Sequence, residues 1–399
     1  MRYYHLSILA LSGFVTSFGA HIVATNLPSY AEVAGVGALT IGLLIAIYDL
    51  AELFAKPFAG FVADRRGMKA TLLVGLAVFI FGSFLFLIIN PKLLVLVRFV
   101  QGLGAAALST ISISLVAKHF VQGRGQAFGI YNAVKGAGYV IAPALGGFII
   151  HAANFAMIFV VSGCIGAVAL LSLFLPPDRP DDATLDDDEN ITLAQFFSMF
   201  KEPRLVPVYA VIIINMFLVG ILFGFLPVYL RSIGYTAVQS GSILSVATAS
   251  YLLVQPLAGH LADRFEIRTT VIAGLLLAAL GIIVATFTSG IALIAVVITA
   301  GIGIGTVWTN SDTLVSVLAH QRNLGASIGA AQSFKELGDR VAAARRSAYA
   351  VFRRARRLRE LRHSCAGSSR PAGEKPGTAG RHDGICLMLN NVILSSSLF

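Results

Sequence analysis

Long apolar stretches, separated by short polar turns, occupy most of the first 320 residues of the chain. Ten of them are long enough to form membrane-spanning helices, since about 20 mostly apolar residues cross a hydrocarbon core of about 30 Å. They cover about residues 6–28, 39–61, 70–90, 93–115, 127–150, 154–175, 205–230, 239–261, 269–288 and 290–315. A further helix is expected to begin near Leu324. The pattern predicts an all-α integral membrane protein.

The chain also repeats itself. The string GFVADRRGMK, Gly60–Lys69, returns 199 residues later as GHLADRFEIR, Gly259–Arg268, and LPSY at Leu27–Tyr30 returns at the same offset as LPVY at Leu226–Tyr229. Solenoids and propellers repeat every 20 to 50 residues, roughly, so this period is far too long for them. Two fused, equivalent halves are expected, an arrangement common among membrane transporters.

The composition agrees with a membrane protein. Of 399 residues, 56% are hydrophobic and 13% charged, and the mean hydropathy is +0.80, whereas soluble domains are about 25% charged. Cys164 lies inside a predicted helix, and Cys365 and Cys386 lie near the C terminus, so no disulfide or metal framework is indicated. No cofactor and no metal are expected.

The spans and the repeat together predict the domain organisation. An N-terminal six-helix half covers residues 1–175, and an incomplete C-terminal half covers residues 205–340. A linker, residues 176–204, contains the acidic run PPDRPDDATLDDDEN at Pro176–Asn190. Because this run is polar and contains several prolines, it is expected to be solvated, and the linker is expected to be cytoplasmic.

Basic residues in the short loops predict the orientation. Alternate loops hold Arg65, Arg66, Lys69, Lys118, Arg124, Arg264, Arg268 and Arg322. The intervening loops hold only Lys92 and Arg231. The N terminus and both motif copies are therefore expected to face the cytoplasm, in a multi-pass protein of the plasma membrane.

The repeat fails after Arg340. From there to Phe399 the chain has 12 basic and 3 acidic residues, whereas the first 339 residues have 18 basic and 17 acidic. Such a basic segment, 341–399, cannot span a membrane, since buried charges cost about 2.5 to 3.5 kcal/mol each on insertion scales. A lipid-binding basic helix and a nucleic-acid arm are two interpretations. A change of reading frame is favoured, which leaves about eleven spans, the eleventh partial and the twelfth missing, and no nucleic-acid partner.

Three motifs in the first half together resemble the major facilitator superfamily. GFVADRRGMK lies between the second and third spans, RFVQGLGAA at Arg98–Ala106 opens the fourth, and GIYNAVKGAGYVIAPALGG at Gly129–Gly147 fills the fifth. The last motif resembles the signature of the drug:proton antiporter branch, with Ala142 where that branch has glycine. The resemblance covers about residues 1–340 and implies a bundle of two six-helix halves.

The resemblance assigns roles to these motif residues. It implies a gating motif that closes the cytoplasmic side, at Gly60, Asp64, Arg65, Gly67 and Lys69 and, in the second copy, at Gly259, Asp263, Arg264 and Arg268. Asp64 is expected to accept from helix N-terminal amides or from an arginine of the opposite half. The second copy is expected to hold less firmly, because Glu266 replaces a glycine.

The fourth and fifth helices carry two further implied sites. The antiporter-like motif falls on Gly129, Gly138, Pro143, Gly146 and Gly147, small residues that allow close packing and a proline that allows a bend. The family resemblance assigns Arg98, with Gln101 beside it, to proton coupling. The alternative for Arg98 is an interfacial side chain that extends to the membrane surface near Lys92.

The second helix carries Asp49, Glu52 and Lys56 within a narrow arc of one face, which in lipid must turn toward protein or a water-filled cavity. Their counterparts in the other half are uncharged: Thr248, Tyr251 and Gln255. Asp49 or Glu52 is a candidate proton carrier, with Lys56 beside it. A static ion-pair network is the alternative. His21 on the first helix is expected to line the cavity through a hydrogen bond.

Lys135 and Lys335 occupy matching places on the fifth and eleventh helices, close to the expected cavity. Paired lysines would suit an anionic substrate, unless Glu336 and Asp339 neutralise Lys335. Another group on the tenth helix, Trp308, Asn310 and Asp312, is a candidate lining of the cytoplasmic vestibule, with an interfacial aromatic as the alternative.

These observations predict a secondary transporter and no enzyme. It would move a small organic molecule by alternating access, with efflux by proton antiport as the first expectation and a monomer as the working unit. Uptake or symport of an anionic metabolite and a truncated, inactive copy are the alternatives.

Overall fold

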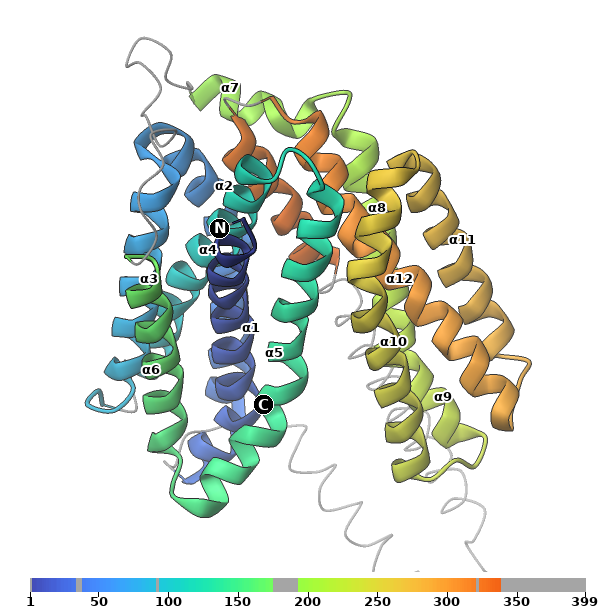
Figure 1. Ribbon diagram of the computed structural model, residues 1–399. Helices are drawn as coiled ribbons and strands as arrows, with labels where there is room; N and C mark the ends of the chain where they lie inside the picture. The colour runs from blue at the N-terminus through green and yellow to red at the C-terminus, as the bar shows by residue number, and fades with distance from the viewer. Residues whose placement is uncertain (1, 34–37, 91–92, 175–192, 321–322, 339–399) are drawn as a thin grey trace, which may run out of the picture. The chain divides into compact units, whose positions relative to one another are not determined.

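The computed structural model describes residues 2–33, 38–90, 93–174, 193–320 and 323–338 (Figure 1). These residues form helices joined by turns, with no strand among them, and each of the ten predicted spans coincides with a helix. Eight helical segments are long and apolar enough to cross a membrane within this part of the chain. The all-α membrane fold expected from the sequence is confirmed.

The N-terminal half consists of six helices. They are α1 (Arg2–Val33), α2 (Ala38–Arg66), α3 (Met68–Leu85), α4 (Leu94–His119), α5 (Arg124–Ala152) and α6 (Ala156–Ser172). α4 packs against both α2 and α3, and α1 packs against α5. α2 ends where Gly67 takes a φ of 93°, a left-handed conformation that favours glycine, and α3 follows at once.

The C-terminal half repeats these helices in the same order. α8 (Val206–Gly220), the π-helical turn η5 (Ile221–Phe225) and α9 (Leu226–Ser232) run on as one helix, followed by α10 (Ala237–Arg264), α11 (Ile267–Ala285), α12 (Gly290–Leu318) and a helix at 324–338. The π turn ends two residues before Pro227. Proline has no N–H to donate to the carbonyl four residues earlier, and its ring would clash with that carbonyl in a regular α-helix.

Matching helix pairs meet at matching glycines. A Cβ on Gly104 of α4 would meet the carbonyl of Gly75 on α3, and a Cβ on Gly303 of α12 would meet that of Gly274 on α11. Both glycines of the second pair stand 199 positions after those of the first. Close backbone contact of this kind is how helices associate in lipid, where burial of apolar side chains gives little driving force.

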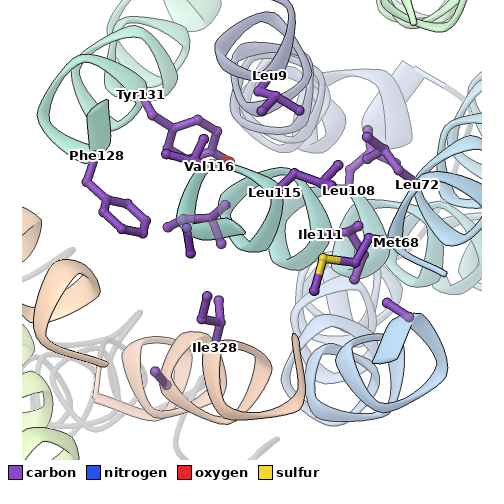
Figure 2. Close-up of a cluster of buried hydrophobic side chains, with 14 of the residues drawn as sticks. Leu9, Met68, Leu72, Leu108, Ile111, Leu115, Val116, Phe128, Tyr131 and Ile328 are labelled. Atoms are coloured by element: carbon purple, nitrogen blue, oxygen red, sulfur yellow. The ribbon is translucent and has the colours of Figure 1, made fainter. Parts of the chain in front are cut away.

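The apolar core of the described region crosses from one half to the other. Figure 2 shows part of it, with Leu72 of α3, Val116 of α4 and Phe128 of α5 among the buried side chains. Ile328, from the helix at 324–338, faces Val116 and Phe128 from the opposite half. The two halves are thus held together by apolar contacts as well as by the polar ones described below.

The last part of the linker, after its acidic run, is helical and packs on α2. The acidic run lies outside the described residues, as do Asp339 and the basic segment 341–399, but Leu193–Ser198 forms α7 and Met199–Lys201 forms the 3-10 turn η4. Phe196 is 1% exposed and packs on Phe58 and Phe61 of α2. The prediction of solvation concerned the acidic run and stays a prediction, whereas Phe196, Met199 and Phe200 after it have the i, i+3, i+4 spacing of an apolar helix face.

Candidate functional site

A cavity of about 450 Å³ lies between the two halves. Its wall is formed by residues of α1, α2, α4 and α5 on one side and of α8, η5, α10, α12 and the helix at 324–338 on the other. Seven of the nine candidate coupling and cavity residues line it: His21, Asp49, Glu52, Lys56, Arg98, Lys135 and Lys335. Gln101 and Asp312 stand one contact behind the wall. The predicted charged face of α2 therefore does turn toward a cavity.

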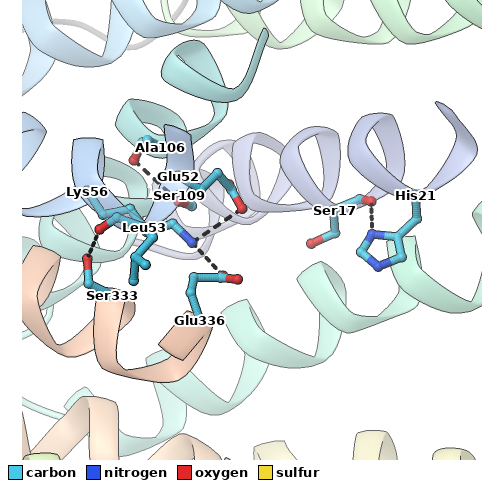
Figure 3. A network of polar contacts seen from close by, with 9 residues as sticks. All are labelled: Ser17, His21, Glu52, Leu53, Lys56, Ala106, Ser109, Ser333 and Glu336. Atoms are coloured by element: carbon cyan, nitrogen blue, oxygen red, sulfur yellow. Dashed lines mark hydrogen bonds and ion pairs between the residues drawn. The ribbon is translucent and has the colours of Figure 1, made fainter. Parts of the chain in front are cut away.

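Lys56 joins the two halves across this cavity (Figure 3). Its Nζ is 2.6 Å from Oε1 of Glu336 on the helix at 324–338 and 3.5 Å from Oε2 of Glu52, one turn earlier on α2. The Lys56 side chain is 2% exposed, so its charge is held by these two carboxylates in place of water. Beside this ion pair, the hydroxyl of Ser333 donates to the carbonyl of Leu53 at 2.7 Å and makes a second contact between the halves.

Asp312 forms a second buried polar cluster. Its carboxylate accepts from Nζ of Lys335 at 2.6 Å, from the amide of Gln332 at 3.0 Å and from the amide of Asn132 at 3.0 Å. Asn132 lies on α5 of the N-terminal half, so this cluster also spans the halves. The ammonium of Lys335 lies 4.6 Å from the centre of the Trp308 ring. A buried carboxylate with three donors meets the requirement that buried charges be paired and hydrogen-bonded.

These two clusters correct one interpretation of the sequence. Neutralisation of Lys335 by Glu336 was one of two alternatives, but Lys335 bonds to Asp312 and Glu336 bonds to Lys56. Consecutive residues on an α-helix point about 100° apart, so the two neighbours face different helices. Asn310 is likewise turned away from the cavity, and its amide donates to the hydroxyl of Thr270 on α11 at 3.0 Å.

Arg98 lies in the protein interior. It is 1% exposed, donates to Oε1 of Gln101 at 2.5 Å and to the carbonyl of Ala20 at 3.3 Å, and stacks over the ring of Tyr48 at 4.0 Å. The amide of Gln101 donates in turn to the hydroxyl of Ser83. The alternative of a side chain reaching the membrane surface is wrong, because every partner of the guanidinium is inside the N-terminal half.

His21 and Lys135 complete the charged lining. Nδ1 of His21 donates to the carbonyl of Ser17 at 3.0 Å (Figure 3). The His21 ring packs edge-on against Tyr139, with the ring centres 4.3 Å apart. Lys135 is buried and lines the cavity, and it has no carboxylate within ion-pair distance among the described residues.

The first motif copy binds the end of a helix from the other half. Both oxygens of Asp64 accept backbone N–H groups at 2.8 Å, from Gly325 and from Ala326, where the helix at 324–338 begins. A Cβ on Gly60 would meet the carbonyl of Gly325. The carboxylate thus satisfies two of the unpaired amides that every helix N-terminus presents, in the position where negative charge is favoured.

The second copy does the same with α5. Asp263 accepts from the N–H groups of Gly125 and Gln126 at 2.7 and 2.9 Å, and a Cβ on Gly259 would meet the carbonyl of Gly125. These distances are close to those of the first copy, and the weaker hold expected from Glu266 stays a prediction. Glu266 has a φ of −62° and an extended backbone, so the second turn does not use the left-handed glycine that the first requires. We call the ends of α2 and α10 that carry these contacts the motif end.

The other motif residues lie around these contacts. Arg65 lies 5.4 Å from the centre of the Phe61 ring, and Arg264 and Arg268 are exposed. In the fifth-helix motif, Gly129 lies against the backbone of Gln255 on α10, and Gly138 and Gly146 lie against side chains and backbone of α1. Nothing lies within 4 Å of the Cβ position of Gly147. The close packing expected of Gly147 is therefore wrong, while Pro143 lies inside α5 as expected.

Two residues of the Asp312 cluster were missed at the sequence level. Asn132 and Gln332 stand 200 positions apart, as Lys135 and Lys335 do, and each lies one turn before its lysine. The signal that selected the lysines could therefore have selected the amides as well.

Comparison with known proteins identifies the family. The family model described as Major Facilitator Superfamily matches residues 9–342. The chain belongs to this superfamily. The match ends close to residue 340, where the internal repeat also fails. Superfamily members are transporters, and the helical fold of this chain is of the same kind.

Curated relatives in the superfamily match over part of the chain. Quinolone resistance protein NorA of Staphylococcus aureus is 28% identical over 180 residues, 44% of this chain and 46% of NorA. Methylenomycin A resistance protein of Bacillus subtilis is 30% identical over 172 residues, 42% of this chain and 37% of that protein. The chain thus spans less than half the length of these curated relatives.

Solved structures agree on the fold. The superfamily transporter FucP in its outward conformation superimposes with a TM-score of 0.70 at 15% identity, covering 84% of this chain and 89% of FucP. The human organic anion transporter MFSD10 gives a TM-score of 0.67 at 16% identity, covering 88% and 94%. At such identities the likeness concerns the arrangement of the helices alone.

Proposed function

We propose that this superfamily member exports a small organic molecule by alternating access, in exchange for protons. The observation that carries the proposal is the Lys56–Glu336 pair, a buried ion pair that joins the two halves across the cavity and has a second carboxylate, Glu52, within reach. A bond between halves that depends on charge is one that a proton can weaken. NorA and the methylenomycin A resistance protein, by their names, support a resistance or export role.

Protonation of a carboxylate beside Lys56 would weaken the contact between the halves. When a proton binds Glu336 or Glu52, Lys56 loses part of its compensating charge, and a buried cation with too little counter-charge is costly. Separation of the halves lets water reach Lys56 and removes that cost. Asp49, one turn before Glu52 and on the same wall, would pass the proton between cavity and pair. Proton binding and substrate binding would then favour opposite openings of one cavity, as exchange requires.

Everted membrane vesicles provide the test, with a quinolone and methylenomycin A as probes. We expect uptake into vesicles that carry a proton gradient, collapse of uptake when a protonophore is added, and no uptake by Glu52→Gln. Glu202→Gln, at an exposed glutamate outside the cavity, should transport normally. Uptake that ignores the gradient would refute proton exchange, and an unchanged Glu52→Gln would refute Glu52 as the carboxylate that binds the proton beside the Lys56–Glu336 pair.

A second candidate is uptake or symport of an anionic metabolite. Lys135 favours it, because this buried lysine lines the cavity without a carboxylate partner among the described residues. A substrate carboxylate or phosphate would supply the missing charge. Right-side-out vesicles that accumulate an organic anion, and lose that ability in Lys135→Gln, would select this candidate over export.

A further inference from the structure

A second cavity lies at the motif end, away from the cavity between the halves. It has a volume of about 690 Å³. Its lining comes from the start of α8, the start of α11 and the end of α12, all within the C-terminal half. Two arginines, Arg204 and Arg268, stand on its rim. We call this cavity the basic cleft.

The wall of the basic cleft is apolar below the two arginines. It is formed by Pro203, Pro207, Val208, Val211, Val271, Ile272, Leu314 and Leu318. Val208 and Val271 are each 3% exposed, so they form the buried floor of the cleft. Cationic groups above an apolar cleft complement a molecule that is anionic at one end and apolar at the other.

Both guanidiniums are available to such a molecule. Arg204 and Arg268 are exposed, and neither has an ion pair or side-chain hydrogen bond within the described part of the chain. Two exposed acidic residues lie near them in the sequence. Glu202 precedes α8, and Glu266 precedes α11 and accepts from the hydroxyl of Thr269 at 3.5 Å. Arg268 belongs to the second motif copy but takes no part in the contacts of Asp263 with Gly125 and Gln126. Its charge is therefore available to a ligand.

The surface beyond the cleft indicates where the apolar part of the ligand would run. Ile272, Leu276 and Ile283 lie along one side of α11, from the cleft to the far end of the helix, and each is more than half exposed. In a membrane protein this surface meets acyl chains. A free phosphate or a soluble metabolite would use the arginines and leave that continuous apolar path empty.

We propose that the basic cleft binds an anionic glycerophospholipid, with its phosphate between Arg204 and Arg268 and an acyl chain along α11. Bidentate guanidinium–phosphate contacts are favourable in this geometry. Because the cleft joins α11 and α12 to α8, an occupant would fix the start of the C-terminal half at the motif end. This function is independent of which substrate the central cavity carries.

Lipid binding to the purified full chain in detergent tests the proposal, measured by native mass spectrometry with phosphatidylglycerol, phosphatidylcholine and glycerol 3-phosphate as probes. We expect phosphatidylglycerol to be retained over phosphatidylcholine. Arg204→Gln/Arg268→Gln should weaken that binding about thirtyfold, taking the usual contribution of a basic residue near an anionic lipid twice. The matched control is Arg231→Gln, an exposed arginine at the opposite end of the half, which should bind normally.

A second variant tests the apolar part. Val211→Trp would fill the cleft without altering its charges, and it should weaken phosphatidylglycerol binding while both arginines remain. Equal binding by the double variant and the Arg231→Gln control would overturn the proposal, as would equal retention of phosphatidylcholine. Displacement of the lipid by an equal concentration of glycerol 3-phosphate would identify a phosphate site with no role for the acyl chain, and so would also overturn it.

Discussion

Replacing Asp312 by asparagine should destabilise the protein through Lys335. The two side chains are 2% and 6% exposed and their charged atoms are 2.6 Å apart. Asparagine keeps the shape but leaves the lysine without a counter-charge in the protein interior. It also leaves three donors, from Lys335, Gln332 and Asn132, facing one amide oxygen.

The magnitude follows from the burial of this pair. Removing one partner of a buried ion pair costs about 3 to 5 kcal/mol, and the stacking of Lys335 on Trp308 is present with either residue at position 312, so it does not change this difference. We expect a loss of about 3 kcal/mol in the free energy of unfolding. The double variant Asp312→Asn/Lys335→Met removes both charges and should lose only about 1 kcal/mol, since a buried pair replaced as a unit is often nearly neutral.

The assay can use the protein's single tryptophan. Trp308 is the one tryptophan in the sequence and lies against Lys335, so its fluorescence reports this site during unfolding by SDS in mixed micelles. The variants compared are Asp312→Asn, Lys335→Met and the double. A double variant that loses as much stability as Asp312→Asn, or the sum of both single losses, would refute the coupling, because independent sites add within about 0.5 kcal/mol.

Three further outcomes are expected. Gly60→Ala should loosen the motif end by about 1 to 3 kcal/mol, because its Cβ would meet the carbonyl of Gly325; hydrogen exchange of the peptide 323–328 should then rise at least about fivefold. Gly42→Ala, with open space around its Cβ position, should leave that exchange unchanged. Asp49→Asn should abolish gradient-driven flux yet retain substrate binding, so intact flux in vesicles would remove it as a carrier. Translation of the other two reading frames after Arg340 should reveal an apolar helix with Gly-Pro and Gly-Gly spacing; its absence would contradict the frame change.

The sequence predicted the scaffold well because lipid imposes a simple rule. Every spanning segment must be a long apolar helix, and a duplicated motif locates equivalent points in the two halves. The repeat alone therefore predicts Asp64 and Asp263 at equivalent helix ends, and Lys135 and Lys335 on equivalent helices.

The pairing inside the site could not be read in the same way. Which way Glu336 points depends on the rotation of the helix at 324–338 against α2, and no local pattern records that rotation. The nearest charge in sequence, Lys335, was therefore chosen as its partner, whereas the structure gives it Lys56, 280 positions away. Packing between halves, and not propensity within a helix, decides such contacts.

The Lys56 ion pair and the Asp64 contacts connect the same pair of helices. Lys56 and Asp64 lie on α2, about 12 Å apart at 1.5 Å per residue, and both bind the helix at 324–338. In the equivalent pair of helices, α10 and α5, Asp263 makes the contact that matches that of Asp64. The position equivalent to Lys56 holds the uncharged Gln255. Under the proposed mechanism a proton would therefore loosen only the first pair. Opening at the motif end should begin between α2 and the helix at 324–338, and the contact between α10 and α5 should act as the hinge.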